Sequence, residues 1–332
     1  MKLSKLLNII VVVIVALTLS AGKRPVTIFI VGDSTAANKN NPDTNPERGW
    51  GMALQGFFDS NVIVDNHAVN GRSSKSFMDE GRWAKVVELI KPGDYVIIQF
   101  GHNDEKPKAD RHTDPGTTFD AHLQRYVDET KEKGGIPILM NSVVRRNFFR
   151  KSVDGVDDES LRNTIYQDEK VNSDTLIDTH GDYLISPQNV AVRNNIVFID
   201  ANAITHGLEQ SLGVVGSRRL HMWFKPGEIP SIPKGRQDNT HYNVYGAHCV
   251  ASLLASELVA KVPKLRRYMH KYDYIVSKRG FGNYLDLQAA IDAAPAKGKT
   301  KIHVLDGKWD KSLIDLKGKK ITFDLFDGAE IE

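Results

Sequence analysis

The sequence contains the residue types that acyl transfer requires: a nucleophile, a base, an acid that orients the base, and donors for an oxyanion. Ser34 offers a hydroxyl within the run Gly-Asp-Ser-Thr at residues 32–35. His241 can accept the serine proton, and Asp238 stands three residues earlier, so one local turn lets its carboxylate reach the other imidazole nitrogen. This spacing favours a serine nucleophile activated by an Asp–His pair, whereas a Gly-Asp-Ser-Thr turn alone could simply cap a helix.

Two further polar blocks, at residues 66–73 and 101–104, offer donors for the oxyanion. Gly71 has no side chain, so its backbone N–H can come close to a substrate. The side-chain amide of Asn103 is an uncharged donor, and the backbone N–H of Ser34 is a third candidate. One such donor typically contributes roughly 3–4 kcal/mol in the transition state, so these groups predict an oxyanion hole.

Strands that alternate with helices would position these blocks. The predicted strands are short and rich in β-branched residues, and they lie at 26–31, 62–65, 95–100, 136–140 and 196–199. Helical patterns lie at 50–58, 81–90, 119–130 and 247–259. The prolines and glycines of residues 217–239 predict a loop. The alternation predicts an α/β fold, a doubly wound parallel sheet flanked by helices. The polar blocks at 32–35, 66–73 and 101–104 each follow a predicted strand, so they should meet at one edge of the sheet. The fourth polar block, at 238–243, directly precedes the last helical pattern.

Together, the four blocks resemble the SGNH (GDSL-type) hydrolases, which carry serine, glycine, asparagine and histidine in that order. More specifically, residues 26–260 resemble the rhamnogalacturonan acetylesterase branch. The similar stretches are residues 32–35, 49–51, 66–68, 71–73, 93–96, 100–104, 145–146, 178–183 and 238–241. The resemblance implies the flavodoxin-like fold of that family, with Ser34, Asp238 and His241 as nucleophile, acid and base. It likewise implies an oxyanion hole built from Ser34, Gly71 and Asn103.

A change in composition after residue 265 predicts a second unit. Residues 266–273 are basic and polar, and they predict a linker after a hydrolase domain at 23–265. Residues 274–332 resemble the opening of the right-handed parallel β-helix of pectin methylesterases and pectate lyases. They are too few to close a core of that kind alone, and the catalytic carboxylates of that family lie further along. We therefore expect a truncated β-helix start with no activity of its own.

Residues 1–22 predict a secretory signal peptide. Lys2 and Lys5 precede an apolar run at 6–19, which ends at small residues and is too short for a comfortable membrane span. No cysteine follows the run directly, and Cys249 is the only cysteine, so an intramolecular disulfide is excluded. We expect a secreted or periplasmic bacterial protein without stable membrane insertion after cleavage. A retained N-terminal anchor is the alternative.

The charge distribution limits the partners of the predicted hydrolase domain. The net charge is +3, and most of it comes from Lys2, Lys5 and the segment after residue 265. Residues 23–265 are therefore not basic, which argues against nucleic-acid binding. An acidic substrate would have to be held by local contacts. The histidines do not show metal-ligand spacing, so we expect no catalytic metal and no other cofactor.

Four side chains of the polar blocks have a binding role and a structural role as alternatives. Trp50 and Arg72 are candidates for substrate binding, whereas Trp50 could equally pack in the core and Arg72 could form a structural ion pair. Arg145 and Arg146 could pair with carboxylates of a pectic substrate or, equally, with acidic side chains of the protein. His102 is expected to be packed or hydrogen-bonded within its loop rather than to act as a base.

Three further polar residues of the sequence need an interpretation. Asp33 is expected to order the serine turn, because Asp238 already stands beside His241. Asp200 ends a predicted strand and could rival Asp238, but no histidine stands close to it in the sequence. Asn70 departs from the family pattern, in which a glycine or another small residue is expected, although Gly71 itself is kept.

The function expected from the sequence is a secreted serine esterase that removes O-acetyl groups from pectic polysaccharide, namely rhamnogalacturonan, through an acetyl-enzyme on Ser34. One alternative is an SGNH esterase that acts on acetyl-xylan, lipid or thioester substrates. Another is a non-catalytic carbohydrate-binding protein that kept the fold. A binding protein has no need of Ser34, Asp238 and His241 together, which argues against that last alternative. The oligomeric state is left open.

Overall fold

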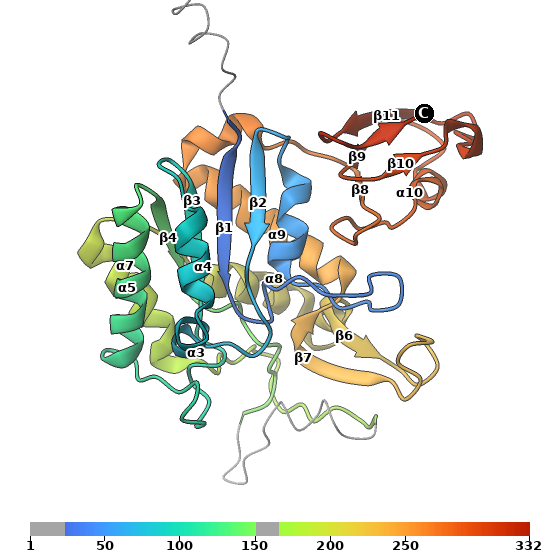
Figure 1. Ribbon diagram of the computed structural model, residues 1–332. Coiled ribbons are helices and arrows are strands. Elements are labelled where there is room, and N and C mark those ends of the chain that lie inside the picture. The colour runs from blue at the N-terminus through green and yellow to red at the C-terminus, as the bar shows by residue number, and fades with distance from the viewer. Residues whose placement is uncertain (1–23, 151–165) are drawn as a thin grey trace, which may run out of the picture.

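The computed structural model describes residues 24–150 and 166–332. The predicted signal peptide at residues 1–22 lies outside the described residues. Within the described ranges, no helix combines the length and the apolar character needed to cross a membrane. Figure 1 shows a sheet flanked by helices, followed by a smaller C-terminal unit, which we define as residues 274–332.

Five parallel strands form the central sheet in the order β2-β1-β3-β4-β5. They are β1 (Val26–Gly32), β2 (Val62–Asn66), β3 (Tyr95–Gln99), β4 (Ile136–Met140) and β5 (Val197–Ile199). All five residues of β3 are buried, as expected for a strand covered on both faces. The predicted doubly wound parallel sheet is thereby confirmed. The strand order reverses between β1 and β3, and ligands bind at such switch points beyond the carboxyl ends of the strands.

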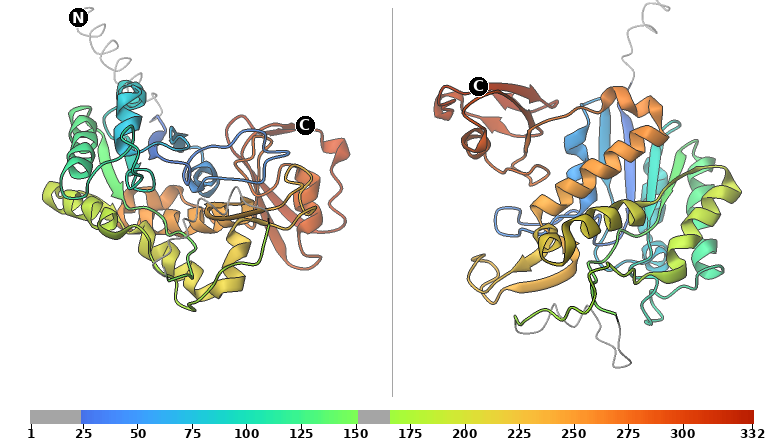
Figure 2. Two further views of the ribbon diagram at one scale, coloured as in Figure 1. Left: turned by 90° about the horizontal axis from the view of Figure 1, so that it is seen from below. Right: turned by 180° about the vertical axis from the view of Figure 1, so that it is seen from behind.

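Helices cover both faces of the sheet, because successive side chains of a strand point to opposite sides. Ile28 and Ile30 of β1 face one layer, and Phe29 and Val31 face the other. The first layer consists of α2 (Trp50–Leu54), α8 (Ala201–Gly216) and α9 (Val244–Lys261). The second consists of α3 (Ser74–Asp79), α4 (Arg82–Leu89), α5 (Thr118–Glu132) and α7 (Ile185–Asn194). Figure 2 shows α9 running across the face opposite to α4 and α5.

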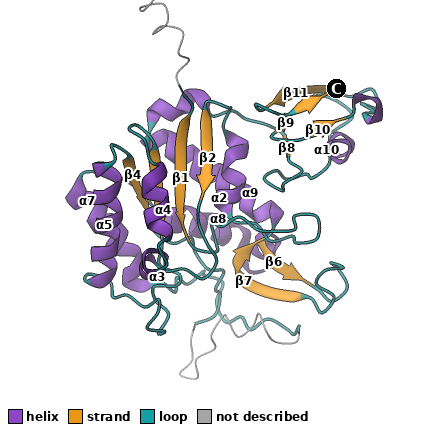
Figure 3. Ribbon diagram, viewed as in Figure 1, coloured by secondary structure: helices purple, strands orange, loops and turns teal. Residues whose placement is uncertain are grey.

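One segment differs from the sequence prediction in a way that matters for the site. Residues 217–239 are not simply a loop, because β6 (His221–Phe224) and β7 (Arg236–Tyr242) form an antiparallel pair (Figure 3). Strand β7 reads Arg-Gln-Asp-Asn-Thr-His-Tyr, and this polar run lacks the alternation that signals a strand. Pairing with β6, which follows the 3-10 helix η3 (Ser217–Leu220), makes it a strand.

The C-terminal unit contains parallel strands in the order β11-β9-β8 and a separate β10-β12 pair. Its elements are β8 (Tyr274–Val276), α10 (Leu287–Ala293), β9 (Lys299–Val304), β10 (Lys308–Trp309), β11 (Lys320–Leu325) and β12 (Glu330–Ile331). Val276, Ile291 and Val304 are buried together in a small apolar cluster within the unit. Its identity as a β-helix start stays a prediction.

The C-terminal unit also packs against the 3-10 helix η1 (Gln55–Phe57), which follows α2. A Cβ at Gly56 would lie 2.7 Å from Cδ1 of Ile275, so the absence of a side chain allows this close approach. His303 donates from Nδ1 to the carbonyl oxygen of Gly56 over 3.2 Å. Because these contacts join segments far apart in the chain, the unit is held against η1 as well as by its connecting segment, which includes the 3-10 helix η4 (Pro263–Tyr268).

Candidate active site

Ser34 lies just beyond the end of β1, at the switch point of the sheet. Gly32 ends the strand, and a Cβ there would lie only 2.7 Å from the carbonyl oxygen of Gln99 on β3. Asp33 is fully buried and accepts hydrogen bonds from the Thr35 backbone N–H at 2.9 Å and the Thr35 hydroxyl at 2.8 Å. Burial raises the pKa of Asp33 while these bonds oppose the shift. Asp33 therefore orders the serine turn, as expected.

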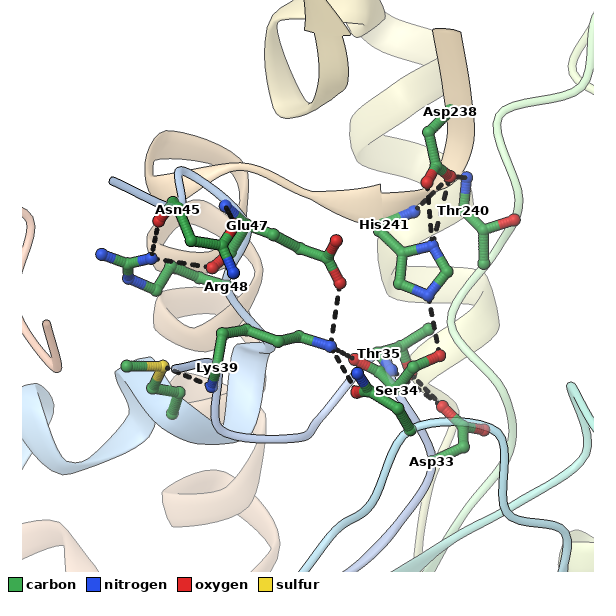
Figure 4. A network of polar contacts seen from close by, with 12 residues as sticks. Asp33, Ser34, Thr35, Lys39, Asn45, Glu47, Arg48, Asp238, Thr240 and His241 are labelled. Carbon is green, nitrogen blue, oxygen red and sulfur yellow. Dashed lines mark hydrogen bonds and ion pairs between the residues drawn. The ribbon is translucent and has the colours of Figure 1, made fainter. Parts of the chain in front are cut away.

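Ser34, His241 and Asp238 form a continuous chain of hydrogen bonds (Figure 4). The Ser34 Oγ lies 2.8 Å from Nε2 of His241. The other ring nitrogen of His241, Nδ1, lies 3.1 Å from Oδ2 of Asp238. Asp238 is 1% exposed and His241 is 5% exposed, so bulk water does not weaken this contact. The arrangement can transfer a proton from the serine to the imidazole while the carboxylate holds the ring.

Strand β7 and its exit turn place the acid and the base. Oδ1 of Asp238 accepts the backbone N–H groups of Thr240 at 2.9 Å and His241 at 3.0 Å, which closes the local turn expected from their spacing. Asn243 then caps α9 by accepting the Gly246 N–H at 3.0 Å. A Cβ on Gly246 would overlap the Leu220 carbonyl oxygen, so the start of α9 is held tightly against the end of η3.

The three predicted oxyanion donors converge on the same cleft, which has a volume of about 420 Å³. Gly71 adopts φ +75°, a left-handed conformation that favours glycine, although a Cβ there would meet open space. The amide Nδ2 of Asn103 donates to the Arg72 carbonyl oxygen over 3.2 Å, which orients it beside the Gly71 loop. Ser34, Gly71, Asn103 and His241 all line this cleft.

Asp104 fixes the loop that carries Asn103. Its carboxylate accepts the Ser74 hydroxyl at 2.5 Å, the Thr113 hydroxyl at 3.0 Å and the backbone N–H of Gly101 at 3.1 Å. Complete burial raises the pKa of Asp104 to about 7 against these bonds. The loop after β3 is therefore fixed by contacts to the start of α3 and to the segment before α5.

Trp50 and Arg72, the two candidates for substrate binding, do not line the cleft. Trp50 has no exposed surface, packs in the core and donates from Nε1 to Oε1 of Gln99 over 3.1 Å. The Arg72 guanidinium pairs with Glu80 at 3.1 Å. We therefore correct both predictions to structural roles, because core packing and an ion pair occupy these side chains.

Of three further candidates, one lines the cleft and two have structural roles. Arg145 lines the cleft and forms an ion pair with Glu105, whereas Arg146 is completely buried and pairs with Glu169. Asp200 caps α8 by accepting the Ala203 N–H at 2.9 Å, so it does not compete with Asp238. Structural roles are thus found for Arg146 and Asp200.

His102 lines the cleft and is hydrogen-bonded within a histidine pair, as expected for a loop histidine. Its Nδ1 lies 3.0 Å from Nε2 of His180, and Nδ1 of His180 lies 3.0 Å from Oδ1 of Asp178. Burial lowers the pKa of His102 well below its ordinary value, and His180 and Arg145 add to this effect. His102 is therefore neutral near pH 7.

Sequence reasoning missed three charged residues near the nucleophile: Lys39, Glu47 and Arg236. Glu47 and Arg236 line the cleft. A signal for Arg236 was available, since residues two apart on a strand share a face and Arg236 stands two before Asp238. Among the described residues, no group of three or more His, Cys, Asp or Glu side chains could hold a metal ion.

Comparison with known proteins agrees with this site and fold. The model of the GDSL-like lipase/acylhydrolase family matches residues 30–247. The rhamnogalacturonan acetylesterase RhgT of Bacillus subtilis is 36% identical over 258 residues, covering 78% of this chain and 97% of the relative. The probable rhamnogalacturonan acetylesterase YesY of Bacillus subtilis is 29% identical, covering 69% of this chain and 90% of the relative.

A solved structure supports the same fold. Protein YxiM of Bacillus subtilis superposes with a TM-score of 0.53 at 24% identity, covering 73% of this chain and 56% of that protein. The structure is a five-stranded parallel sheet flanked by helices, with a serine at the switch point of the sheet. The chain belongs to the GDSL-like lipase/acylhydrolase family and is a carboxylic ester hydrolase.

Proposed function

We propose that this protein is a secreted serine esterase that removes O-acetyl groups from rhamnogalacturonan through an acetyl-enzyme on Ser34. The observation that carries the proposal is the 2.8 Å contact between the Ser34 hydroxyl and Nε2 of His241. The contact of Asp238 with the opposite ring nitrogen fixes the tautomer, so that Nε2 is the nitrogen that accepts the serine proton.

The mechanism follows from these positions. Ser34 attacks the acetyl carbonyl carbon while His241 takes the hydroxyl proton, and Asp238 stabilises the imidazolium that forms. The backbone N–H groups of Ser34 and Gly71 and the amide of Asn103 bind the oxyanion. Collapse expels the sugar oxygen, which takes the proton from His241. Water then attacks the acetyl-enzyme with His241 as base, and acetate leaves as Ser34 is restored.

The composition of the cleft supports a small acyl group on a polar substrate. Among the described residues, its lining contains no aliphatic side chain and no phenylalanine, tyrosine or tryptophan. A long acyl chain would therefore find little apolar surface to bury, whereas sugar hydroxyls would find hydrogen-bonding partners. The similarity to the rhamnogalacturonan acetylesterase RhgT and the probable rhamnogalacturonan acetylesterase YesY supports rhamnogalacturonan as the carbohydrate.

The proposed layout of the chain comprises a signal peptide at 1–22, a hydrolase domain at 23–265, a linker at 266–273 and the opening of a β-helix at 274–332. The parallel strands β8, β9 and β11 support the last part. Export to the periplasm or the medium is proposed from the basic and apolar pattern of the first residues.

The experiment compares acetate release from acetylated rhamnogalacturonan, acetylated xylan and an aryl acetate, using wild type and Ser34→Ala. Release from the pectic substrate that disappears in the variant is the expected result. Release from the xylan or the aryl acetate alone would keep the serine chemistry and reject the substrate. No serine-dependent release from any of them would favour a non-catalytic protein with this fold.

A further inference from the structure

Lys39, Glu47 and Arg236 form a chain of charges beside the nucleophile. Lys39 and Glu47 are 6% and 8% exposed, and Arg236 is mostly buried. Nζ of Lys39 lies 2.9 Å from Oε1 of Glu47, and Oε2 of Glu47 lies 3.0 Å from Nη1 of Arg236. Figure 4 shows Lys39 and Glu47 beside the serine turn. Burying charged groups is costly unless they are paired. The presence of three such groups beside one cleft therefore needs an explanation.

The Lys39 ammonium joins the two loops that carry the proposed backbone oxyanion donors. It donates to the carbonyl oxygen of Ser34 over 2.7 Å and to Oδ1 of Asn70 over 2.6 Å. Asn70 directly precedes Gly71, so one cation sets the spacing between the Ser34 turn and the Gly71 loop. This contact also gives a reason for Asn70, the position at which the sequence departs from the family pattern.

At the other end of this chain of charges, Arg236 contacts Asp238, the acid of the triad. Nη2 of Arg236 lies 2.5 Å from Oδ2 of Asp238, the oxygen that also faces Nδ1 of His241. His241 in turn contacts the Ser34 hydroxyl, so the contacts close into a ring that returns to the serine. In order, the ring contains Ser34, Lys39, Glu47, Arg236, Asp238 and His241.

The four permanent charges of this ring alternate in sign and cancel. Burial raises the pKa of Glu47, but Lys39, His241 and Arg236 together outweigh it, so the pKa is lowered. Burial lowers the pKa of Arg236, but Asp238 and Glu47 outweigh it, so the pKa is raised. Each charge is thus kept by its neighbours, and removing one leaves the ring with a net charge at a largely buried position.

We propose that Lys39, Glu47 and Arg236 are positioning residues for ester hydrolysis. Lys39 acts through Ser34 and Asn70 and holds the oxyanion donors at one spacing. Glu47 and Arg236 act through Asp238 and set the electrostatic surroundings of the base. This inference rests on the serine mechanism proposed above, so its test uses an aryl acetate, which makes no demand on the carbohydrate specificity.

The first arm of the test measures kcat and KM for Lys39→Met and Asn70→Ala. Both changes loosen the spacing of the oxyanion donors, so kcat should fall on the order of 10- to 100-fold with little change in KM. Asn70→Ala keeps every ion pair of the ring and decides the outcome if Lys39→Met does not fold. Lys85→Met, on the exposed surface of α4, is the matched control and should behave as wild type.

The second arm measures the pH midpoint of the acidic limb of kcat/KM, which reports the free base. Removing a cation in Arg236→Met stabilises the imidazolium, so the midpoint should rise by roughly half a unit or more. Removing an anion in Glu47→Gln should lower it. Arg236→Lys should restore the wild-type midpoint. Charged or titratable groups near His241 include Asp238 and Arg236 from β7, Glu47 from the segment before α2, Asp33 after β1 and His102 after β3. Arg111 and Arg145 line the same cleft, and Lys39 pairs with Glu47.

Opposite shifts for Arg236→Met and Glu47→Gln would support the ring, because general loss of structure cannot move the midpoint in two directions. Unchanged kcat in Asn70→Ala together with unmoved midpoints would overturn it. Ser34→Ala in the same assay separates this result from the proposed function. If that variant kept its activity, the serine mechanism would be rejected and the ring with it.

Discussion

Arg48 donates a hydrogen bond from Nε to the carbonyl oxygen of Gly280 over 3.0 Å, although 232 residues separate them in the chain. Arg48 is 2% exposed and directly follows Glu47, which lines the cleft. The C-terminal unit therefore contacts the segment that carries one wall of the candidate active site. Since every triad and oxyanion residue precedes residue 265, the unit is expected to affect stability more than chemistry.

Gly280 offers a test of this contact with a matched control. Gly280→Ala should destabilise the protein, because its Cβ would lie 2.4 Å from Cβ of Pro42. Gly298→Ala carries the strain of a positive φ without such a clash, since nothing lies within 4 Å of its Cβ. Thermal unfolding should show a larger loss for Gly280→Ala than for Gly298→Ala. Equal losses would mean that the contact near Arg48 contributes little.

Deletion of residues 274–332 tests the same interface on a larger scale. The deletion removes the Gly280 acceptor of the buried Arg48 and the partner of Gly56, and leaving a buried donor unsatisfied costs about 1–3 kcal/mol. The melting temperature should therefore fall, while kcat for an aryl acetate stays close to that of the full chain. A large loss of kcat in a still-folded protein would show that the unit shapes the cleft.

Asn103→Ala should reduce turnover by roughly two to three powers of ten and leave KM nearly unchanged. The reason is that an oxyanion donor acts on charge that develops only in the transition state. Steady-state kinetics on an aryl acetate would measure this. Turnover equal to that of wild type would remove Asn103 from the oxyanion hole.

Arg145 and Arg146 are neighbours in the sequence, but we expect Arg146 to affect stability and Arg145 to affect substrate binding. Arg146→Met should lower the free energy of unfolding by about 1–3 kcal/mol, because Ser217 and Asn239 lose a buried hydrogen-bonding partner while Glu169 keeps its ion pair with Arg218. Arg145 lines the cleft, so Arg145→Met should raise KM for acetylated pectic substrate more than for an aryl acetate. Denaturant unfolding and parallel kinetics on both substrates check the two expectations. A loss of stability in Arg145→Met together with a raised KM in Arg146→Met would contradict both expectations.

His248 should make stability depend on pH. Burial lowers the pKa of His248 from 6.5 to about 4, although a hydrogen bond with the Gly282 backbone acts in the opposite direction. Between these two values the unfolded chain binds the proton and the folded chain does not, so the free energy of unfolding falls as pH falls through this window. The total loss is about 3 kcal/mol at pH 4.

The variant His248→Gln removes this proton uptake. Its free energy of unfolding, measured by denaturant between pH 7 and pH 4, should fall less steeply than that of wild type. Parallel curves for the two proteins would show that His248 is not kept neutral by burial.

The sequence alone determined the features that depend on neighbouring residues. The three-residue spacing of Asp238 and His241 needs only one turn, which two backbone hydrogen bonds to Asp238 close. The β-branched runs specify buried parallel strands, and polar blocks after such strands meet at one edge because the strands are parallel. Ser34, Gly71 and Asn103 can therefore be predicted from the sequence as residues of one site.

Only the tertiary structure decided which side chains line the cleft and which belong to the scaffold. Trp50 lies within one of the stretches that resemble the family, but its indole is held by Gln99 of β3, which is far away in the sequence. Lys39 and Asn70 meet because two loops converge on the edge of the sheet, and no local spacing encodes that pairing. Strand β7 is polar along its length, so only its partner β6 makes it a strand. These outcomes rest on non-local contacts, which a one-dimensional pattern does not specify.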